Sequence, residues 1–193
     1  MHEARPKVII IAGPNGAGKS TLAPSLLRDT FHVTDYVNAD TLASGLSAFQ
    51  PDKVAIEAGR LMLKRLRVLA EQQESFAFES TLASRSHARW LNDLREEGYT
   101  FHLLFLWLRN PETAVARVKE RVRLGGHDVP EPVVRRRYRR GIINFLELYR
   151  PLAESWVVYD NSGPGSPLAL AAAKEDRVLS IYQPSLWSRF SEK

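Results

Sequence analysis

A glycine-rich stretch near the N-terminus holds the residues best suited to chemistry. It consists of Gly13-Pro14-Asn15-Gly16-Ala17-Gly18-Lys19-Ser20 and is followed by Thr21. The spacing G-x-x-x-x-G-K-[ST] is that of a P-loop, whose backbone N–H groups surround phosphate oxygens because the glycines leave room for them. An apolar run, Val8–Ala12, precedes the stretch, and a helix-like segment follows it. We therefore expect residues 13–21 to bind ATP.

Two side chains at the end of this stretch have predicted roles of their own. Lys19 would reach the β- and γ-phosphates, and the Ser20 hydroxyl would be a ligand of Mg²⁺. The helix after the loop would add its positive dipole end. A plain glycine turn between a core strand and a helix is the alternative, and the Lys-Ser pair after a strand favours phosphate binding.

Asp40 follows a short predicted strand, residues 32–37. Open α/β sheets bind their ligands at such strand ends. A carboxylate in this position could take the proton of an acceptor hydroxyl during phosphoryl transfer. The alternative is a helix cap for residues 41–43. Of the two, we favour the role of general base.

A second acidic residue, Glu79, comes directly after the predicted strand 75–78 and is followed by Ser80 and Thr81. We expect these three side chains to bind the acceptor molecule. For Glu79 itself, an interaction with Mg²⁺ through water and a cap for the next helix are the alternatives.

Basic residues in the second half of the chain could neutralise the transferring phosphate. Arg121 lies four residues after Arg117, so both lie on one face of a predicted helix. A loop around His127 comes next, and we expect this histidine near the bound acceptor. The loop and the helix after it, residues 125–140, resemble a lid.

An arginine-rich run, residues 135–140, lies in the first half of the helix after this loop. Five arginines in six positions span too wide an arc to meet at one phosphate, so most of them must be solvated. Within the run we favour Arg137 and Arg136, because both are next to the inward-facing Tyr138 and close to the loop. Arg137 joins Arg121 as a predicted catalytic residue.

The elements that position these residues alternate between apolar strands and amphipathic helices. Predicted strands cover residues 8–12, 32–37, 75–78, 100–108 and 156–159. Predicted helices cover residues 18–28, 51–73, 85–97, 110–124 and 131–149, and Pro24 should kink the first of them near Ser20. This alternation predicts an α/β fold with three layers, α/β/α, of the kinase-like P-loop NTPase type: a central, mainly parallel sheet with helices on both faces.

The whole chain, residues 1–193, is predicted to be a single domain. Its tail, residues 162–193, is the least regular part. There we expect strands at 168–172 and 177–182 that form a hairpin, and a closing helix at 184–190.

Composition excludes several classes of protein. There are no cysteines, which argues against disulfides and thiolate metal sites, and the 44% apolar and 25% charged residues are typical of a globular protein. No secretory signal and no long apolar run is present, so we expect a cytoplasmic protein without a membrane segment. The net charge of +5 permits a nucleic-acid partner without demanding one.

The absence of certain motifs narrows the range of reactions that this protein could catalyse. The sequence lacks Asn-Lys-x-Asp, the base-reading element of GTPases, and Asp160-Asn161-Ser162-Gly163 comes after the last strand of the predicted core, so we interpret it as a turn. The predicted strand 100–108 is not followed by an acidic residue of the kind expected in motor ATPases. These absences favour an enzyme that moves phosphate between small molecules.

Four blocks of the sequence together resemble the zeta toxin family, and in particular its small bacterial predicted ATPases. They are residues 13–20, Asn38-Ala39-Asp40, Phe78-Glu79-Ser80-Thr81-Leu82, and Gly125–Pro130 with its arginine-rich helix. The resemblance covers residues 7–161. It implies ATP- and Mg²⁺-dependent phosphorylation of a hydroxyl on a nucleotide-sugar such as UDP-N-acetylglucosamine. By this likeness Asp40 is the general base, Glu79 lies in the substrate region, and His127 stands where the family has an arginine. An antitoxin partner is also implied.

Two other functions remain open on the sequence. A metabolic kinase of the gluconate or shikimate type would have the same layout. A nucleic-acid-binding ATPase could use residues 135–140 on a phosphate backbone, but Tyr138 is assigned to the core, which leaves no aromatic platform for bases.

Overall fold

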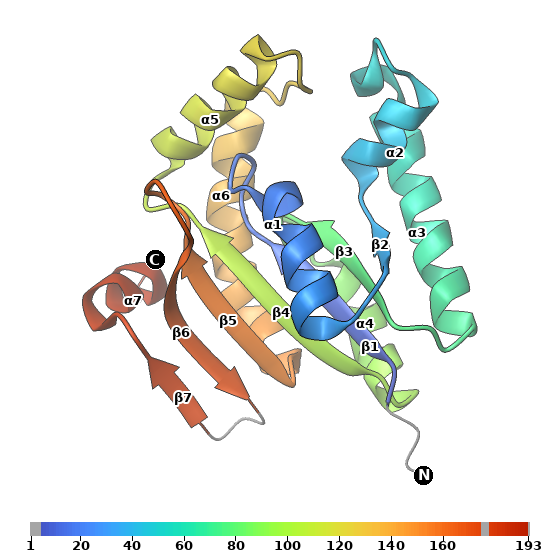
Figure 1. The fold of residues 1–193 in the computed structure, drawn as a ribbon, viewed down its shortest axis with the longest axis vertical. Coiled ribbons are helices and arrows are strands. Elements are labelled where there is room, and N and C mark those ends of the chain that lie inside the picture. The colour runs from blue at the N-terminus through green and yellow to red at the C-terminus, as the bar shows by residue number, and fades with distance from the viewer. Residues whose placement is uncertain (1–4, 175–177, 193) are drawn as a thin grey trace.

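The computed structural model describes residues 5–174 and 178–192. Within these ranges, seven strands form one sheet (Figure 1). The strands are β1 (Lys7–Ala12), β2 (Asp35–Val37), β3 (Phe76–Ser80), β4 (Thr100–Trp107), β5 (Ser155–Asp160), β6 (Leu168–Lys174) and β7 (Val178–Ile181). The helices are α1 (Lys19–Ser25), α2 (Ala39–Leu46), α3 (Ala55–Glu71), α4 (Ser86–Glu96), α5 (Pro111–Arg123), α6 (Glu131–Asn144) and α7 (Pro184–Ser191).

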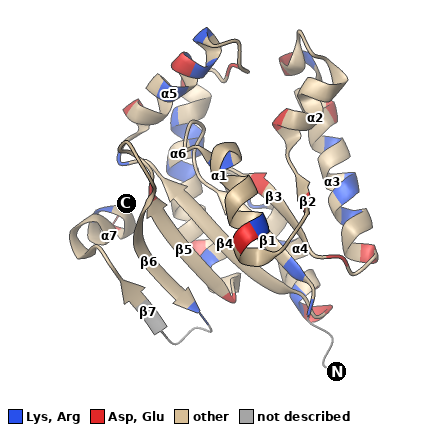
Figure 2. Ribbon diagram, viewed as in Figure 1, with Lys and Arg blue, Asp and Glu red and all other residues tan. Residues whose placement is uncertain are grey.

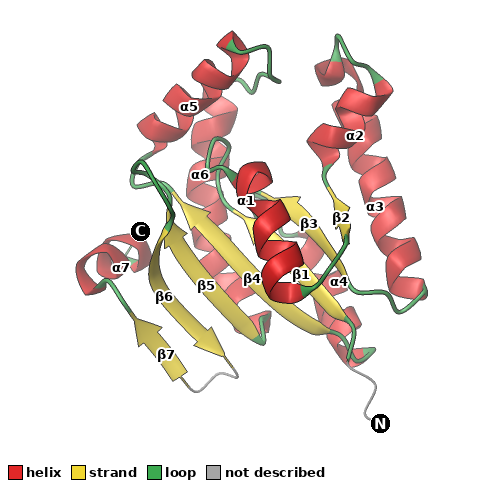
Figure 3. Cartoon of the chain, in the orientation of Figure 1, coloured by secondary structure: helices red, strands yellow, loops and turns green. Residues whose placement is uncertain are grey.

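The order of strands across the sheet is β2-β3-β1-β4-β5-β6-β7. The first five are parallel to one another, and β6 and β7 extend the sheet as antiparallel strands (Figure 3). Helix α1 covers one face, and α4 and α6 cover the other (Figure 1). The prediction of a three-layer α/β/α fold with a mainly parallel sheet is therefore confirmed.

The centre of the sheet is apolar because it is covered on both faces. Residues 8–12 of β1 are completely buried, and β4 is buried at every position except His102. An aromatic cluster of Phe105, Phe145 and Phe190 joins β4 to the helices behind it, with ring centroids 4.9 to 5.6 Å apart. Each buried phenylalanine contributes about 1.5–3 kcal/mol of apolar burial, so this cluster helps to hold the helices against the sheet.

The predicted hairpin in the tail is confirmed by the antiparallel pairing of β6 with β7, and the predicted closing helix is α7. The turn expected around residues 174–176 falls largely outside the described residues. The remaining short helical turns are two π-helices, Leu26–Phe31 and Phe145–Tyr149, and two 3-10 helices, Pro51–Val54 and Arg150–Leu152.

Three predicted boundaries were wrong for local reasons. The first helix changes to a π-helix at Leu26, shortly after Pro24, which has no N–H to donate. The strand expected at 32–37 begins only at Asp35, because His32 ends the π-helix in the left-handed conformation, with φ 55°. The helix expected from Pro51 begins as a 3-10 turn.

Because β1 to β5 run in the same direction, their carboxyl ends lie along one edge of the sheet. The glycine-rich loop, the start of α2 and the end of β3 therefore meet at this edge. Among the described residues, no helix is both long and apolar enough to cross a membrane.

Candidate nucleotide and acceptor site

A cavity of about 350 Å³ opens at the carboxyl edge of the sheet. It is lined by the glycine-rich loop, by the residues that follow β2 and β3, and by arginines of α5 and α6. The lining residues are Asn15, Gly16, Gly18, Lys19, Ser20, Thr21, Asn38, Ala39, Asp40, Glu79, Ser80, Thr81, Arg117, Arg121 and Arg137. Most of the predicted site residues are thus brought together in one place.

The loop requires glycine at two positions for different reasons. Gly13 has φ 141°, and a Cβ there would lie 2.3 Å from the Leu106 carbonyl oxygen. Gly18 has φ 82° and precedes the first helical residue, Lys19. Both conformations disfavour L side chains, so the loop keeps its backbone close to the sheet and open toward the cavity.

Lys19 extends back along the loop, where its Nζ donates to the carbonyl oxygens of Gly13 and Pro14, each at 3.1 Å. Burial lowers the pKa of this ammonium group, and the neighbouring carboxylates of Glu79 and Asp40 oppose that effect. A half-buried cation that donates to neutral carbonyls would gain stronger hydrogen bonds from phosphate oxygens. The position of Lys19 thus fits the predicted contact with a triphosphate.

Four side chains form a chain of hydrogen bonds beside Lys19. Asn38 Nδ2 donates to Ser20 Oγ and to the Tyr36 hydroxyl, both at 3.3 Å, and the Tyr36 hydroxyl donates to Glu79 Oε1. Burial, together with the bond to Glu79, raises the pKa of Tyr36, so this hydroxyl stays protonated. The chain fixes the Ser20 hydroxyl and the Glu79 carboxylate relative to each other.

Asp40 lies in the first turn of α2, and its side chain is exposed at the cavity. The residue that caps α2 is Asn38, whose Oδ1 accepts from the N–H groups of Asp40 and Thr41 at 2.8 and 3.3 Å. The alternative in which Asp40 is itself the cap is therefore wrong. The carboxylate of Asp40 remains available to a ligand.

Glu79 is the fourth residue of β3, one position before the end of the strand. The next helix, α4, begins at Ser86 with Arg85 as its flanking residue, so the alternative of Glu79 as a helix cap is also wrong. Ser80 and Thr81 continue along the same wall of the cavity. The Ser80 hydroxyl accepts from the Leu82 N–H at 3.0 Å, which fixes the turn after the strand.

Three arginines line the cavity: Arg117, Arg121 and Arg137. Arg121 stands out because its Nε and Nη2 atoms are buried and have no hydrogen-bond partner among the described residues. Burial also lowers the pKa of Arg137, against the attraction of nearby Asp40. Buried guanidinium donors without partners fit an anion, because leaving them unpaired is costly.

Arg136 does not reach this cavity, contrary to the expectation that placed it beside Arg137. It lines a separate, exposed groove on α6 with Arg135, Arg139 and Arg140. Successive residues of a helix point about 100° apart, so two adjacent arginines cannot share one target. Only Arg137 of the arginine-rich run joins the site.

His127 also lies outside the cavity lining. Its Nδ1 faces Asp52 Oδ1, in the 3-10 turn between α2 and α3. The loop that carries it packs against Arg121, since a Cβ at Gly126 would lie 2.6 Å from Arg121 Cγ. The loop at 125–130 thus contacts both Arg121 and the 3-10 turn Pro51–Val54, and His127 does not line the cavity.

Charge is divided between the two walls of the cavity. Figure 2 shows acidic positions at the start of α2 and the end of β3, and basic positions on α5, α6 and at the start of α1. Among the described residues, no group of three His, Cys, Asp or Glu side chains could hold a metal on its own. Mg²⁺ usually keeps several waters and binds one or two protein oxygens plus phosphates, so Ser20, with Asp40 and Glu79 nearby, fits a site of that kind.

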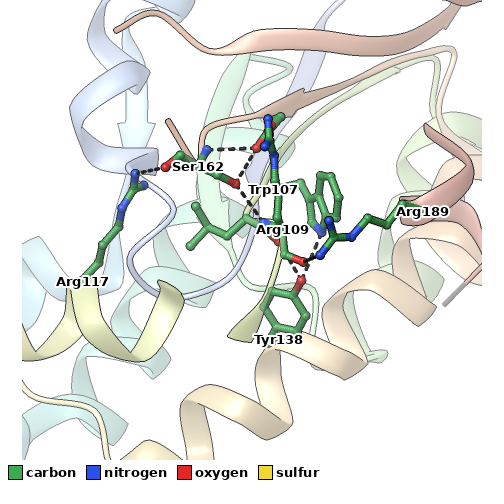
Figure 4. A network of polar contacts seen from close by, with 8 residues as sticks. Trp107, Arg109, Arg117, Tyr138, Ser162 and Arg189 are labelled. Carbon is green, nitrogen blue, oxygen red and sulfur yellow. Dashed lines mark hydrogen bonds and ion pairs between the residues drawn. The ribbon is translucent and has the colours of Figure 1, made fainter. Parts of the chain in front are cut away.

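A second network, which the sequence did not reveal, connects the far side of the loop to the end of β5 (Figure 4). Arg117 donates to the Ser162 carbonyl oxygen at 3.2 Å, and Ser162 Oγ and N–H both donate to Asp160 Oδ1. Asp160 is buried, and its other oxygen accepts from Arg109 Nε at 2.8 Å. The predicted turn at 160–163 is therefore part of the support of the site.

Residues 8–140 match the model of a protein family described as an AAA domain. The chain belongs to the AAA domain family. A relative from Haemophilus influenzae (strain Rd), itself uncharacterised, is 33% identical over 132 residues, which are 68% of this chain and 92% of the relative. The last strands and α7 of this AAA-domain protein lie beyond the matched residues.

Two solved structures have a similar fold. One is a chain of the AvrRxo1-ORF1:-ORF2 complex with ATP, with a TM-score of 0.74 and 17% identity over 97% of this chain. The AAA-domain protein spans 64% of that chain, less than two thirds of its length. The other belongs to the PezAT toxin-antitoxin system of Streptococcus pneumoniae, with a TM-score of 0.69 and 17% identity over 98% of this chain and 79% of that one. At this identity the likeness shows the three-layer fold alone.

Proposed function

We propose that this protein is a kinase that transfers the γ-phosphate of ATP to a hydroxyl group of a small molecule. One observation carries the proposal: Asp40 lines the same cavity as Lys19 and Arg121, whose buried Nε and Nη2 atoms have no hydrogen-bond partner among the described residues. A phosphate-binding loop alone would explain nucleotide binding. An unpaired carboxylate on the facing wall adds the group that a hydroxyl acceptor needs.

In this mechanism the phosphate-binding loop and Lys19 hold the triphosphate, and Asp40 accepts the proton of the acceptor hydroxyl. The freed oxygen bonds to the γ-phosphorus while the bond to the β–γ bridging oxygen breaks, so that ADP leaves. Arg121 and Arg137 stabilise the charge on the transferred group, a contribution that arginines in other phosphoryl-transfer sites make at about 10³-fold or more. Mg²⁺, held by the Ser20 hydroxyl and the phosphates, would supply further charge neutralisation.

For the acceptor, we propose a nucleotide-sugar such as UDP-N-acetylglucosamine as the first compound to test. The likeness of four sequence blocks to the zeta toxin family supports this choice, as does the fold shared with a chain of the PezAT system. The acceptor wall is the part of the cavity formed by the residues at the ends of β2 and β3. It includes the carboxylate of Glu79 and the hydroxyls of Ser80 and Thr81, which suit the hydroxyl groups of a sugar. The same likeness supports an antitoxin as a protein partner.

The test is phosphate transfer from radiolabelled ATP, with Mg²⁺, to a panel of nucleotide-sugars, gluconate, shikimate and other polyols. Product with a nucleotide-sugar alone supports the zeta-toxin-like function, and product with a small acid such as gluconate supports the metabolic alternative. The D40N variant serves as the matched control, because it keeps the shape of the side chain and loses the base. Absence of labelled product across the panel would refute the proposal, whether or not ATP binds.

The nucleic-acid alternative has a separate test. The groove on α6 holds Arg136, Arg139 and Arg140, and such a patch would bind a phosphate backbone with an affinity that falls steeply with salt. Binding of oligonucleotides at about 50 mM salt, lost in an R136A/R139A/R140A variant, would favour it. We expect none, since the described part of this groove includes no aromatic side chain on which a base could stack.

A further inference from the structure

The turn after β5 contacts the phosphate-binding loop through Asn161, a residue that does not line the cavity. Asn161 Nδ2 donates to the Ala17 carbonyl oxygen at 2.8 Å. The Asn161 side chain is also close to Gly18, where a Cβ would lie 2.8 Å from the same nitrogen. Asn161 thus touches the peptide group that joins Ala17 to Gly18.

Because a peptide bond is planar, this contact also determines the direction of the next N–H group, that of Gly18. In a trans peptide the C=O of one residue and the N–H of the next lie in one plane and point in opposite directions. When Asn161 holds the Ala17 carbonyl, the Gly18 N–H of the same peptide must point away from Asn161. Gly18 lines the cavity, where a triphosphate would offer oxygens that can accept from such an N–H.

Asn161 is itself held in place by the sheet. Its N–H donates to the Trp107 carbonyl oxygen at 2.9 Å, which continues the pairing of β4 with β5 by one residue. On one side of it the buried Asp160 is bonded to Arg109, and on the other Ser162 is bonded to Asp160 (Figure 4). The amide of Asn161 is therefore presented to the loop from a rigid support.

We propose that Asn161 is a positioning residue of the nucleotide site, which presets the Gly18 amide as a hydrogen-bond donor for a phosphate oxygen of a nucleoside triphosphate. The inference rests on the proposed binding of ATP by this loop and adds a residue far from the motif. Arg117 supports the same arrangement, because it donates to both the Gly16 and the Ser162 carbonyl oxygens, at 3.4 and 3.2 Å.

The experiment compares N161A and N161D with the wild type by calorimetric titration of Mg·ATP. N161A removes the donor to Ala17, and we expect its Kd for ATP to rise about 10-fold. N161D places a carboxylate oxygen against the Ala17 carbonyl oxygen and should weaken binding further, about 100-fold. N92A, which removes an exposed asparagine bonded to Glu96 on α4, is the control and should leave the Kd unchanged.

A second readout separates positioning from general stability. In the wild type, ATP should shift the Gly18 amide proton downfield in the NMR spectrum, and this shift should be lost in N161A while the melting temperature stays close to that of the wild type. If N161A binds ATP like the wild type and keeps the Gly18 shift, the proposal is overturned. If both variants melt at lower temperature but bind ATP normally, Asn161 is a structural residue only and the proposal is likewise overturned.

The test of Asn161 does not depend on whether the protein transfers phosphate. If the wild type binds ATP but phosphorylates no acceptor, the kinase proposal fails, while the Kd values of the Asn161 variants still decide the positioning role. If transfer occurs and the Kd of N161A is unchanged, the kinase proposal stands and the role of Asn161 is refuted. If the wild type does not bind ATP, both proposals are refuted.

Discussion

The two walls of the cavity are built in different ways. On the nucleotide wall, the loop backbone is fixed by hydrogen bonds on several sides: Gly13 N–H to the Ser80 carbonyl oxygen at 3.2 Å, Ala17 N–H to Pro14 at 3.1 Å, and Asn161 to Ala17 at 2.8 Å. On the acceptor wall, Asp40 is exposed on the first turn of α2, which follows a strand of only three residues.

This difference indicates that the nucleotide wall is more rigid than the acceptor wall. A triphosphate presents the same oxygens in every nucleotide, so a fixed array of backbone donors suits it. The acceptor wall depends on side chains at the ends of β2 and β3, and these can differ between proteins without any change in the sheet. We therefore expect substitutions on the nucleotide wall to change ATP affinity and those on the acceptor wall to change turnover.

The largest expected effect tests the acceptor wall. In D40N, turnover should fall about 100-fold or more, because the amide cannot accept the hydroxyl proton, while the Kd for ATP stays within about 2-fold of the wild type. Steady-state kinetics with the best acceptor of the panel and calorimetry with ATP measure the two quantities. Equal turnover in both proteins would show that Asp40 is not the base.

The next effect tests the nucleotide wall. Replacing Lys19 with alanine should weaken ATP binding about 100-fold, since the charge-assisted hydrogen bonds to the β- and γ-phosphates are lost. Calorimetry with ATP and AMP distinguishes this cause: the affinity for AMP should change little. An unchanged affinity for ATP would mean that the triphosphate does not occupy this loop.

A smaller effect is expected at Arg121, one of the arginines that line the cavity. R121A should raise the KM for ATP about 10-fold, and R121K should restore only part of the loss, because an ammonium group lacks the fork of the guanidinium. R136A is the matched control, because this arginine lies in the separate groove on α6 and should leave all constants unchanged. If R121A and R136A behave alike, Arg121 makes no phosphate contact.

The smallest effect concerns the scaffold behind both walls. Burial lowers the pKa of His87, which packs against Phe78 with ring centroids 5.4 Å apart, and also that of His102. The unfolded chain therefore binds more protons below its histidine pKa of about 6.5, so stability should decrease as the pH falls through that value. Thermal melts between about pH 7.5 and 5.5 should show a drop of a few degrees.

In H87Q the decrease between the same two pH values should be shallower, because one titrating group is gone. The ATP affinity of this variant at neutral pH should match that of the wild type, since His87 lies behind the sheet and does not line the cavity. A melting temperature that does not depend on pH would contradict the assignment of buried neutral histidines.

The sequence predicted correctly those elements of the fold that depend on local patterns. The alternation of strands and helices predicted the three-layer sheet, and the motif of residues 13–20 predicted the loop at the cavity. Asp40, Glu79 and Arg137 all line the cavity. The first two were predicted from their position at the end of a strand, and Arg137 from its place next to the inward-facing Tyr138. The tail hairpin and α7 were also predicted from turn signals and apolar spacing.

The features of the site that could not be predicted from the sequence depend on contacts between distant residues. Asn38 and Tyr36 connect Ser20 to Glu79, which only the pairing of β2 with β3 makes possible. The sequence placed Arg136 and His127 at the site, because neither the helix face nor the position of the loop could be read from spacing alone. One signal was available for Asn38, since an asparagine directly before a helix is a frequent N-cap.

The hydrogen bond between Asn161 and Ala17 joins residues 144 positions apart. During synthesis, a nascent chain that ends before β5 already carries the complete nucleotide-binding signature but not the side chain that braces it. This hydrogen bond can therefore form only after β5 has left the ribosome and paired with β4. The contact is thus among the last parts of the site that can form during synthesis, although the signature is among the first residues to be made.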